Sequence, residues 1–233
     1  MQASWRNVLS LIRFRLARVS VLFASVIGLL AAKPECTIPD VTAALKLDLE
    51  VCRPAPVTIE EKERVLQTLP AEGAVSNFGK AEARKLTAIE PVLRVHRRIG
   101  VYDVKVISVP QAWTGLYERA VLLISLPALR LATSDELAAL VAHEIGHEYI
   151  SEQYADAKIH KDRRRLRELE LVCDAIAMRT LAYLAIPPER LQTAVEKTSW
   201  YNRERLGLAF DEGNYPSLKE RQLLMKQMSV LGK

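Results

Sequence analysis

Two histidines with three residues between them, His143 and His147, follow directly on a strong signal for the start of a helix. Thr133 and Glu136 have the spacing of a capping box, and an apolar run separates them from the first histidine. We therefore expect a helix over residues 134–152. Residues four apart on a helix project from the same face, about one turn apart. Any fold that contains this segment must bring further polar groups to that face.

The segment His143-Glu144-Ile145-Gly146-His147 has the His-Glu-x-x-His pattern of zinc-binding helices. Its two histidines suit two ligands of one tetrahedral zinc ion, and Glu144 is placed to take a proton from a metal-activated water. Gly146 costs about 1 kcal/mol of helix stability relative to alanine, which indicates a close approach to the backbone there. The alternative is an amphipathic helix without metal, which would bury a His-Glu-His cluster among apolar side chains with nothing to neutralise it.

Two histidines are too few for a catalytic zinc site, so the sequence must supply a third ligand. Glu170 and Asp174 lie four residues apart on a second predicted helix, on a face that also carries apolar residues. A carboxylate there is costly unless it is paired or bound to metal. We expect Glu170 to be the third metal ligand and Asp174 to accept the ring N–H of a zinc histidine. Glu168 is a competing ligand, but it is expected to pair with Arg164 or Arg165. An exposed acidic stripe is the alternative for Glu170 and Asp174.

The N-terminal segment 1–32 has the composition of a targeting sequence. It contains four arginines and no acidic residue, and it ends in fourteen uncharged, mostly apolar residues at 19–32. This stretch has the length of a signal-peptide core and is shorter than the roughly 20 residues of a membrane span. We expect a signal peptide or membrane anchor, with an exported domain that is periplasmic or tethered on the extracytoplasmic side. The alternative is an N-terminal helix of a cytosolic protein.

The formal charge of +5 is carried almost entirely by that N-terminal segment. Without its four arginines the chain has 29 basic and 28 acidic residues, so the body has no electrostatic footprint for nucleic acid. A basic run at 158–167 has the charge to bind acidic lipid headgroups or an acidic peptide. A solvated helix face paired with neighbouring acidic residues is the favoured interpretation.

Residues 33–57 contain four prolines and are predicted to form a linker or N-terminal extension, with at most a short helix or strand around 41–51. Cys36 and Cys52 lie in this segment. In an oxidising compartment a disulfide between them would contribute on the order of 3 kcal/mol, and two free cysteines are the alternative. Cys173, in a predicted helix, is expected to be a free buried thiol.

The remaining residues, 58–233, are predicted to form one domain. Two strand-like runs, 101–109 and 119–126, are rich in Val, Ile and Leu. Helices are predicted at 58–69, at 80–98 (bent or split by Pro91 and stopped by Gly100), and at 134–152, 162–185, 188–206 and 217–229. Strands in the first half and helices in the second predict an α+β fold, mainly helical, with a small β-sheet beside the helix that carries the histidines.

Together these motifs resemble the gluzincin peptidases of the HtpX-like and BepA-like family, which includes the CAAX prenyl proteases. The matching segments are 134–139, 143–147 and 170–174, within a region of similarity from Val101 to Arg221. The resemblance implies a zincin-like fold, one zinc ion per chain, and hydrolysis of peptide bonds in a peptide or protein substrate. It also implies that the strand from Ala120 to Ser125 is an edge strand beside the cleft, to which an extended peptide adds; a core strand is the alternative.

The chain departs from this family in two places. The family has a His-Pro pair followed by an arginine, whereas this chain has Tyr215 before Pro216 and keeps Arg221. We expect Tyr215 and Arg221 to be candidates for stabilising the tetrahedral intermediate, with a packing role as the alternative for Tyr215. The connection from His147 to Glu170 is short, which predicts a tight helix–loop–helix and a more open cleft.

The sequence thus predicts a zinc metalloendopeptidase that acts in extracytoplasmic protein processing or quality control, with His143, His147 and Glu170 as metal ligands and Glu144 as general base. The replacement at Tyr215 favours one alternative, a peptidase-like binding or chaperone module with weak or no turnover. A zinc hydrolase of another class is a third interpretation, for which the sequence contains no pocket signature.

Overall fold

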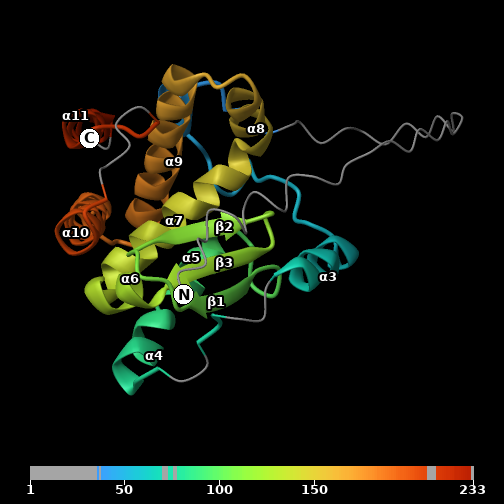
Figure 1. Cartoon of the computed structure of the whole chain (residues 1–233). Helices are drawn as coiled ribbons and strands as arrows, with labels where there is room; N and C mark the ends of the chain where they lie inside the picture. The colour runs from blue at the N-terminus through green and yellow to red at the C-terminus, as the bar shows by residue number, and fades with distance from the viewer. Residues whose placement is uncertain (1–35, 37, 70–72, 76–77, 209–213, 232–233) are drawn as a thin grey trace, which may run out of the picture. The chain divides into compact units, whose positions relative to one another are not determined.

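One small sheet and a larger set of helices make up the described part of the chain. The computed structural model describes residues 36, 38–69, 73–75, 78–208 and 214–231, so the expected leader at 1–32 lies outside it. The strands are β1 (Asp103–Ile107), β2 (Thr114–Tyr117) and β3 (Val121–Ser125). Their order is β1-β3-β2, with β3 parallel to β1 and antiparallel to β2. The predicted α+β class, mainly helical with a small sheet, is confirmed (Figure 1).

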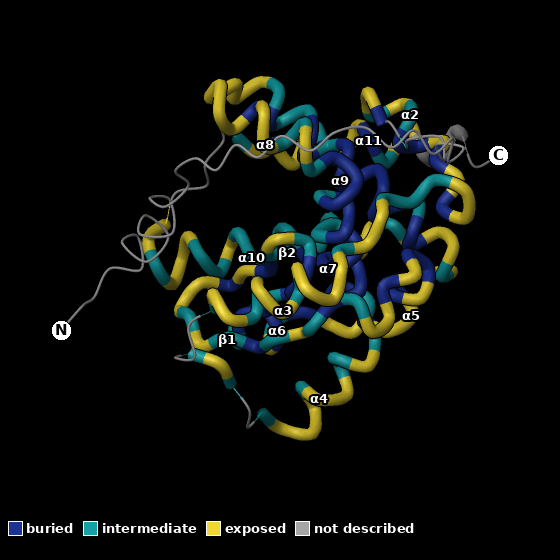
Figure 2. Tube along the Cα trace, turned by 90° about the vertical axis from the view of Figure 1, so that its right-hand side faces the viewer, coloured by how far each residue is buried: buried dark blue, intermediate teal, exposed yellow. Residues whose placement is uncertain are grey.

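The helices, in chain order, are α2 (Val41–Leu45), α3 (Ile59–Thr68), α4 (Lys80–Leu86), α5 (Ile89–Val95), α6 (Leu126–Leu131), α7 (Ser134–Tyr149), α8 (Ser151–Ile159), α9 (Arg163–Tyr183), α10 (Glu189–Leu206) and α11 (Leu218–Leu231). Buried residues concentrate on α7 and α9, which pack against each other, whereas α3 and α4 contain none (Figure 2). Within the described ranges, no helix combines the length and the apolar character needed to span a membrane.

The start of α7 follows the predicted capping box. The Thr133 hydroxyl accepts a hydrogen bond from the Glu136 N–H at 3.2 Å, and the Glu136 carboxylate accepts one from the Thr133 N–H at 2.8 Å. Lys197 of α10 also donates to this carboxylate at 2.8 Å. Burial opposes the ionised form of Glu136, but the hydrogen bonds from Lys197 and Thr133 outweigh it and lower the pKa of the carboxyl group. The cap therefore fixes α7 to α10 as well as starting the helix.

The end of α7 differs from the prediction. Ile150 leaves helical geometry, with φ −123° and ψ 17°, so α7 ends at Tyr149 and α8 begins at Ser151. α8 fills much of the connection between His147 and Glu170. The expected tight helix–loop–helix is therefore wrong, because the connection contains a helix of its own.

Close contact between α7 and α9 depends on Gly146. A side chain at this position would collide with the backbone of Cys173, which confirms the close approach expected from a glycine within a helix. Asp162 caps the start of α9, and its carboxylate accepts the Arg165 N–H at 2.9 Å. Cys173 is free and buried, as predicted.

The sheet corrects the expectation for its edge. The strand predicted beside the cleft, β3, is the central strand, and the edge strand is β2, which lies next to α7. β2 falls within residues 110–118, which were predicted to be a connection. Its sequence, Thr114-Gly115-Leu116-Tyr117, is short and contains a glycine, so its strand signal is weak.

The predicted helix at 80–98 is split, but before Pro91 and not at it. α4 ends at Leu86 and α5 begins at Ile89, which places Pro91 in the first turn of α5. The break spares the proline ring a clash with the carbonyl group of Thr87. α5 ends earlier than expected: Arg97, with φ 54°, takes the left-handed position, and the Arg98 N–H bonds to the Leu93 carbonyl at 2.7 Å.

The described part of the expected linker 33–57 belongs to the core. Ile38, Leu45, Leu47 and Leu49 are buried, and α2 packs against α9. Cys36 and Cys52 form a disulfide bond with their Cα atoms 5.1 Å apart. The prolines indicated an irregular backbone correctly, but an irregular segment with apolar residues at these positions can still cover a helix.

Candidate metal centre

Three predicted ligands come together between α7 and α9. His143 and His147 project from one face of α7, and Glu170 faces them from α9. The Nε2 atom of His143 lies 3.2 Å from Glu170 Oε2, and Nε2 of His147 lies 3.8 Å from Oε1. One ligand atom from each residue lies within 4.8 Å of the others. The described residues therefore provide a two-nitrogen, one-oxygen donor set, which is the type found in catalytic zinc sites.

The two oxygens of Glu170 have different surroundings. Oε1 accepts a hydrogen bond from the Tyr154 hydroxyl at 2.8 Å, whereas Oε2 is buried and has no hydrogen bond of good geometry among the described residues. Glu170 is only 1% exposed. Burial opposes its ionised form, but the two histidines and Tyr154 outweigh that effect and lower the pKa of the carboxyl group to about 2. A buried, ionised carboxylate with an unsatisfied oxygen beside two imidazoles fits a cation ligand.

Two adjacent residues of α9 face the outer ring nitrogens of the two histidines. Asp174 Oδ1 lies 2.9 Å from Nδ1 of His143, and Sγ of Cys173 lies 3.5 Å from Nδ1 of His147. Burial lowers the pKa of His143, but its contacts with Asp174 and Glu170 outweigh burial and raise the pKa to about 10. Burial lowers the pKa of His147 and raises that of the Cys173 thiol. A metal ion bound at Nε2 of His143 would displace the proton there, and the remaining ring proton on Nδ1 would donate to Asp174.

Arg221 contacts Asp174 and also lines the cleft, so its expected role at the oxyanion stays a prediction. Its guanidinium donates to the same Asp174 oxygen that faces His143, and only 4% of the residue is exposed. Tyr215 is partly exposed and lines the cleft near Tyr154, where burial first, then Glu170 and to a smaller extent Tyr215 raise the pKa of the Tyr154 hydroxyl. Arg221 thus holds Asp174 beside His143 and, like Tyr215, contributes to the cleft wall.

Glu144 faces a cleft of about 710 Å³ between α7, α10 and the edge strand β2. Its Oε1 accepts a hydrogen bond from the Thr114 hydroxyl at 2.8 Å. The wall includes Trp113, Leu116 and Asn202 in addition to the three candidate ligands. The competing carboxylate Glu168 lies outside this wall and pairs with Arg164 at 3.0 Å, as predicted.

Tyr154, which donates a hydrogen bond to Glu170, was not predicted from the sequence as a site residue. Its ring also packs edge-on against His147, with the ring centroids 4.8 Å apart, and Lys158 Nζ lies 4.5 Å from the centroid of the same ring. Tyr154 stands seven residues after His147, two helical turns along the same side, and that spacing is the only signal in the sequence. The helix break at Ile150, between His147 and Tyr154, makes this spacing hard to recognise from the sequence.

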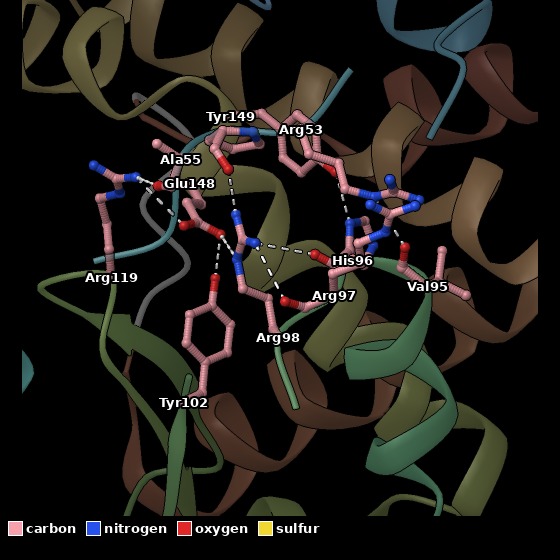
Figure 3. Close-up of polar contacts among 11 residues, drawn as sticks. Arg53, Ala55, Val95, His96, Arg97, Arg98, Tyr102, Arg119, Glu148 and Tyr149 are labelled. Atoms are coloured by element: carbon pink, nitrogen blue, oxygen red, sulfur yellow. Dashed lines mark hydrogen bonds and ion pairs between the residues drawn. The ribbon is translucent and has the colours of Figure 1, made fainter. Parts of the chain in front are cut away.

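A second buried polar cluster surrounds Glu148, the residue after His147 (Figure 3). Arg98 donates to its carboxylate at 2.8 Å, and the Tyr102 hydroxyl donates to the same oxygen. Arg119, from the turn between β2 and β3, reaches the other oxygen at 3.4 Å. Arg98 also donates to the Pro54 carbonyl at 2.7 Å. The cluster ties the C-terminal end of α7 to the sheet and to the N-terminal segment.

His96 is a core histidine, only 1% exposed. Nδ1 lies 2.8 Å from the Tyr149 hydroxyl, and Nε2 lies 2.9 Å from Oγ1 of Thr180. Thr180 gives its own hydroxyl proton to the Ile176 carbonyl, so Nε2–H donates to Thr180 and Nδ1 accepts from Tyr149. Burial, followed by the charge of Arg98, lowers the pKa of His96 to about 3. His96 is therefore neutral and structural.

No protein-family model matches this chain, and a comparison with curated proteins gives no match either.

Proposed function

We propose that this protein is a zinc-dependent metalloendopeptidase of the HtpX-like and BepA-like gluzincin type. The observation that carries the proposal is the convergence of His143, His147 and Glu170 at the wall of a cleft that also contains Glu144. The donor set, the unsatisfied Oε2 of Glu170 and the supported Nδ1 atoms all suit one bound zinc ion. When bound, zinc would polarise the scissile carbonyl and make water acidic enough to lose a proton near neutral pH.

In this proposal Glu144 is the general base. It takes a proton from the attacking water and returns it to the leaving amine, so that one carboxylate serves both steps. The Thr114 hydroxyl holds one oxygen of that carboxylate at 2.8 Å, which leaves the second oxygen for water. We assign Arg221 to holding Asp174, and through it the ring of His143, because its guanidinium is engaged there. Tyr215 is the candidate donor to the oxyanion.

An extended peptide is the substrate class that suits this cleft. β2 is an edge strand, paired only to β3 among the described strands, and its residues line the cleft beside Glu144. Peptides add to such an edge by main-chain hydrogen bonds that do not depend on side-chain identity. An enzyme that binds its substrate through main-chain hydrogen bonds accepts many protein substrates, as processing or quality control of proteins requires.

We further propose that the domain works outside the cytoplasm, periplasmic or tethered through residues 1–32. The Cys36–Cys52 disulfide supports this location, because disulfides persist in oxidising compartments.

Turnover of unfolded casein by the zinc-loaded protein tests the activity. The Glu144→Gln variant should retain zinc and lose about 10²–10⁴-fold in kcat, the range for removal of a general base. Glu152→Gln, an exposed carboxylate on α8, is the matched control and should keep full activity. Binding of unfolded protein by the wild type without any cleavage would replace the peptidase with the binding or chaperone module.

A further inference from the structure

The free edge of β2 offers few main-chain groups. In an antiparallel pair, alternate residues bond to the partner strand and the residues between them point their N–H and C=O groups away. The Ser125 N–H bonds to the Trp113 carbonyl at 2.8 Å, so Trp113 and, two residues on, Gly115 face β3. Thr114 and Leu116 therefore direct their main-chain groups to the free edge. The next outward residue in the other direction is Ala112.

Ala112 is already paired, and its partner is a side chain. Asn202 of α10 accepts the Ala112 N–H through Oδ1 at 2.8 Å and donates from Nδ2 to the Ala112 carbonyl at 2.9 Å. A carboxamide presents one acceptor and one donor side by side, as a residue of a neighbouring strand would. Asn202 thus fills the place that the main chain of a bound peptide would otherwise take next to Ala112.

The position of Thr114 relates the Ala112–Asn202 pair to the proposed general base, Glu144. Its hydroxyl bonds to Glu144, so the main-chain groups of Thr114 are level with the general base. Leu116 continues the free edge to one side of that level, and the Ala112–Asn202 pair closes it on the other. As far as the described residues go, the edge is therefore open in only one direction from Glu144.

We propose that Asn202 is a specificity-determining residue that limits strand pairing of a peptide substrate to one side of the scissile bond. A bound peptide pairs with Thr114 and Leu116 and leaves the strand direction before it reaches Ala112. Residues added to the peptide on the Leu116 side add main-chain hydrogen bonds, and residues added on the Ala112 side do not. This inference rests on the proposed peptidase function.

Peptide binding to the full-length, zinc-loaded Glu144→Gln variant provides a test without turnover. Fluorescent peptides that share one central sequence are lengthened by single alanines at the N-terminus or at the C-terminus, and Kd is measured by anisotropy. With Asn202 present, lengthening at one end should lower Kd and lengthening at the other should leave it unchanged. With Asn202→Ala added, the insensitive end should become sensitive, with about 3- to 10-fold tighter binding once a residue pairs with the freed Ala112.

Thr198→Ala is the matched control. Thr198 lies one turn earlier on α10 and also lines the cleft, but its hydroxyl bonds only within its own helix, to the Ala194 and Val195 carbonyls. This variant should keep the one-sided length dependence. Asn202→Asp retains the acceptor and loses the donor, so it should give an intermediate effect if strand β2 keeps its place.

Three results would overturn the inference. One is equal gains in affinity at both ends with Asn202 intact. Another is an unchanged one-sided pattern in both Asn202 variants, with native circular dichroism and full zinc content. The third is that no peptide of any length binds, in which case the proposed peptidase function fails as well. Binding without the predicted end dependence removes only the role of Asn202.

Discussion

A Cβ atom added to Gly146 would lie 2.8 Å from the Cα atom of Cys173 and 3.1 Å from its carbonyl oxygen. Both contacts are with backbone, which cannot rotate away. We expect Gly146→Ala to destabilise the protein by about 1–3 kcal/mol in urea denaturation, because α7 and α9 must separate. It should also reduce zinc content, since the ligands lie on these two helices. Gly207→Ala, with open space around its Cβ but φ 61°, should lose stability and keep its zinc.

Metal analysis can separate the proposed ligand from its neighbour. Purified wild type should hold about one zinc per chain, and Glu170→Ala should lose most of it. Glu168→Ala should retain the metal, because Glu168 is 42% exposed and bound to Arg164 and Arg165. If Glu168→Ala empties the site while Glu170→Ala remains loaded, the ligand assignment is wrong.

Tyr154 should control the affinity of the site without being a ligand. Tyr154→Phe keeps the ring that packs on His147 and removes only the hydrogen bond to Glu170 Oε1, so the carboxylate becomes freer to turn. We expect zinc affinity to fall about 10- to 100-fold in a chelator competition. The control is Tyr183→Phe, on the same helix as Glu170. The Tyr183 hydroxyl lies 3.3 Å from Glu50 near the surface, so this variant should have no effect on zinc affinity. Equal affinities in all three proteins would rule out the positioning role.

The buried pair Arg98–Glu148 should be costly to break from one side. Arg98→Met leaves the Glu148 carboxylate buried with Tyr102 and the longer, 3.4 Å contact to the partly exposed Arg119, and we expect a loss of about 3–5 kcal/mol. The double variant Arg98→Met, Glu148→Leu should recover part of that loss. Arg94→Met breaks a pair that is 69% and 61% exposed, and should cost less than about 1 kcal/mol. Urea denaturation gives all three values, and a single-variant loss as small as that of Arg94→Met would contradict the argument.

His96 should make the protein less stable in acid. Its pKa is about 3 in the folded state against an ordinary value of 6.5, so the unfolded chain binds one more proton between these values. Stability therefore falls as pH drops from about 6.5 toward 3, by about 1.4 kcal/mol per pH unit from this residue. His96→Asn should have a flatter stability profile over pH 4–6 than wild type.

The sequence allowed prediction of the features that depend on local spacing. His143 and His147, and Glu170 and Asp174, are each four apart, so the helical repeat alone places each pair on one face. That two such faces would meet followed from the cost of burying unpaired carboxylates, and the structure brings the three candidate ligands together. The α+β class followed in the same way from the separation of strand-like and helical patterns.

The features that were missed depend on pairing between distant elements. Glu148 stands beside a predicted ligand, but its partner Arg98 is fifty positions away, and no periodicity connects them. β2 was missed because its four residues have a weak strand signal and gain their order from β3. For the same reason β3 was taken for the edge strand. Arg221 was identified, but its contact with Asp174 depends on how α11 packs, which the local sequence does not specify.

The contact between Arg221 and Asp174 also has a consequence for the order in which parts of the site can form during synthesis. During synthesis His143, His147 and Glu170 emerge well before α11, and Asp174 has no guanidinium beside it until Arg221 has been added and α11 has packed. The ligands are therefore present in the growing chain before the support of His143 is complete. A nascent chain stopped before residue 221 would carry every proposed metal ligand and Asp174, and would still lack the guanidinium that donates to the Asp174 carboxylate.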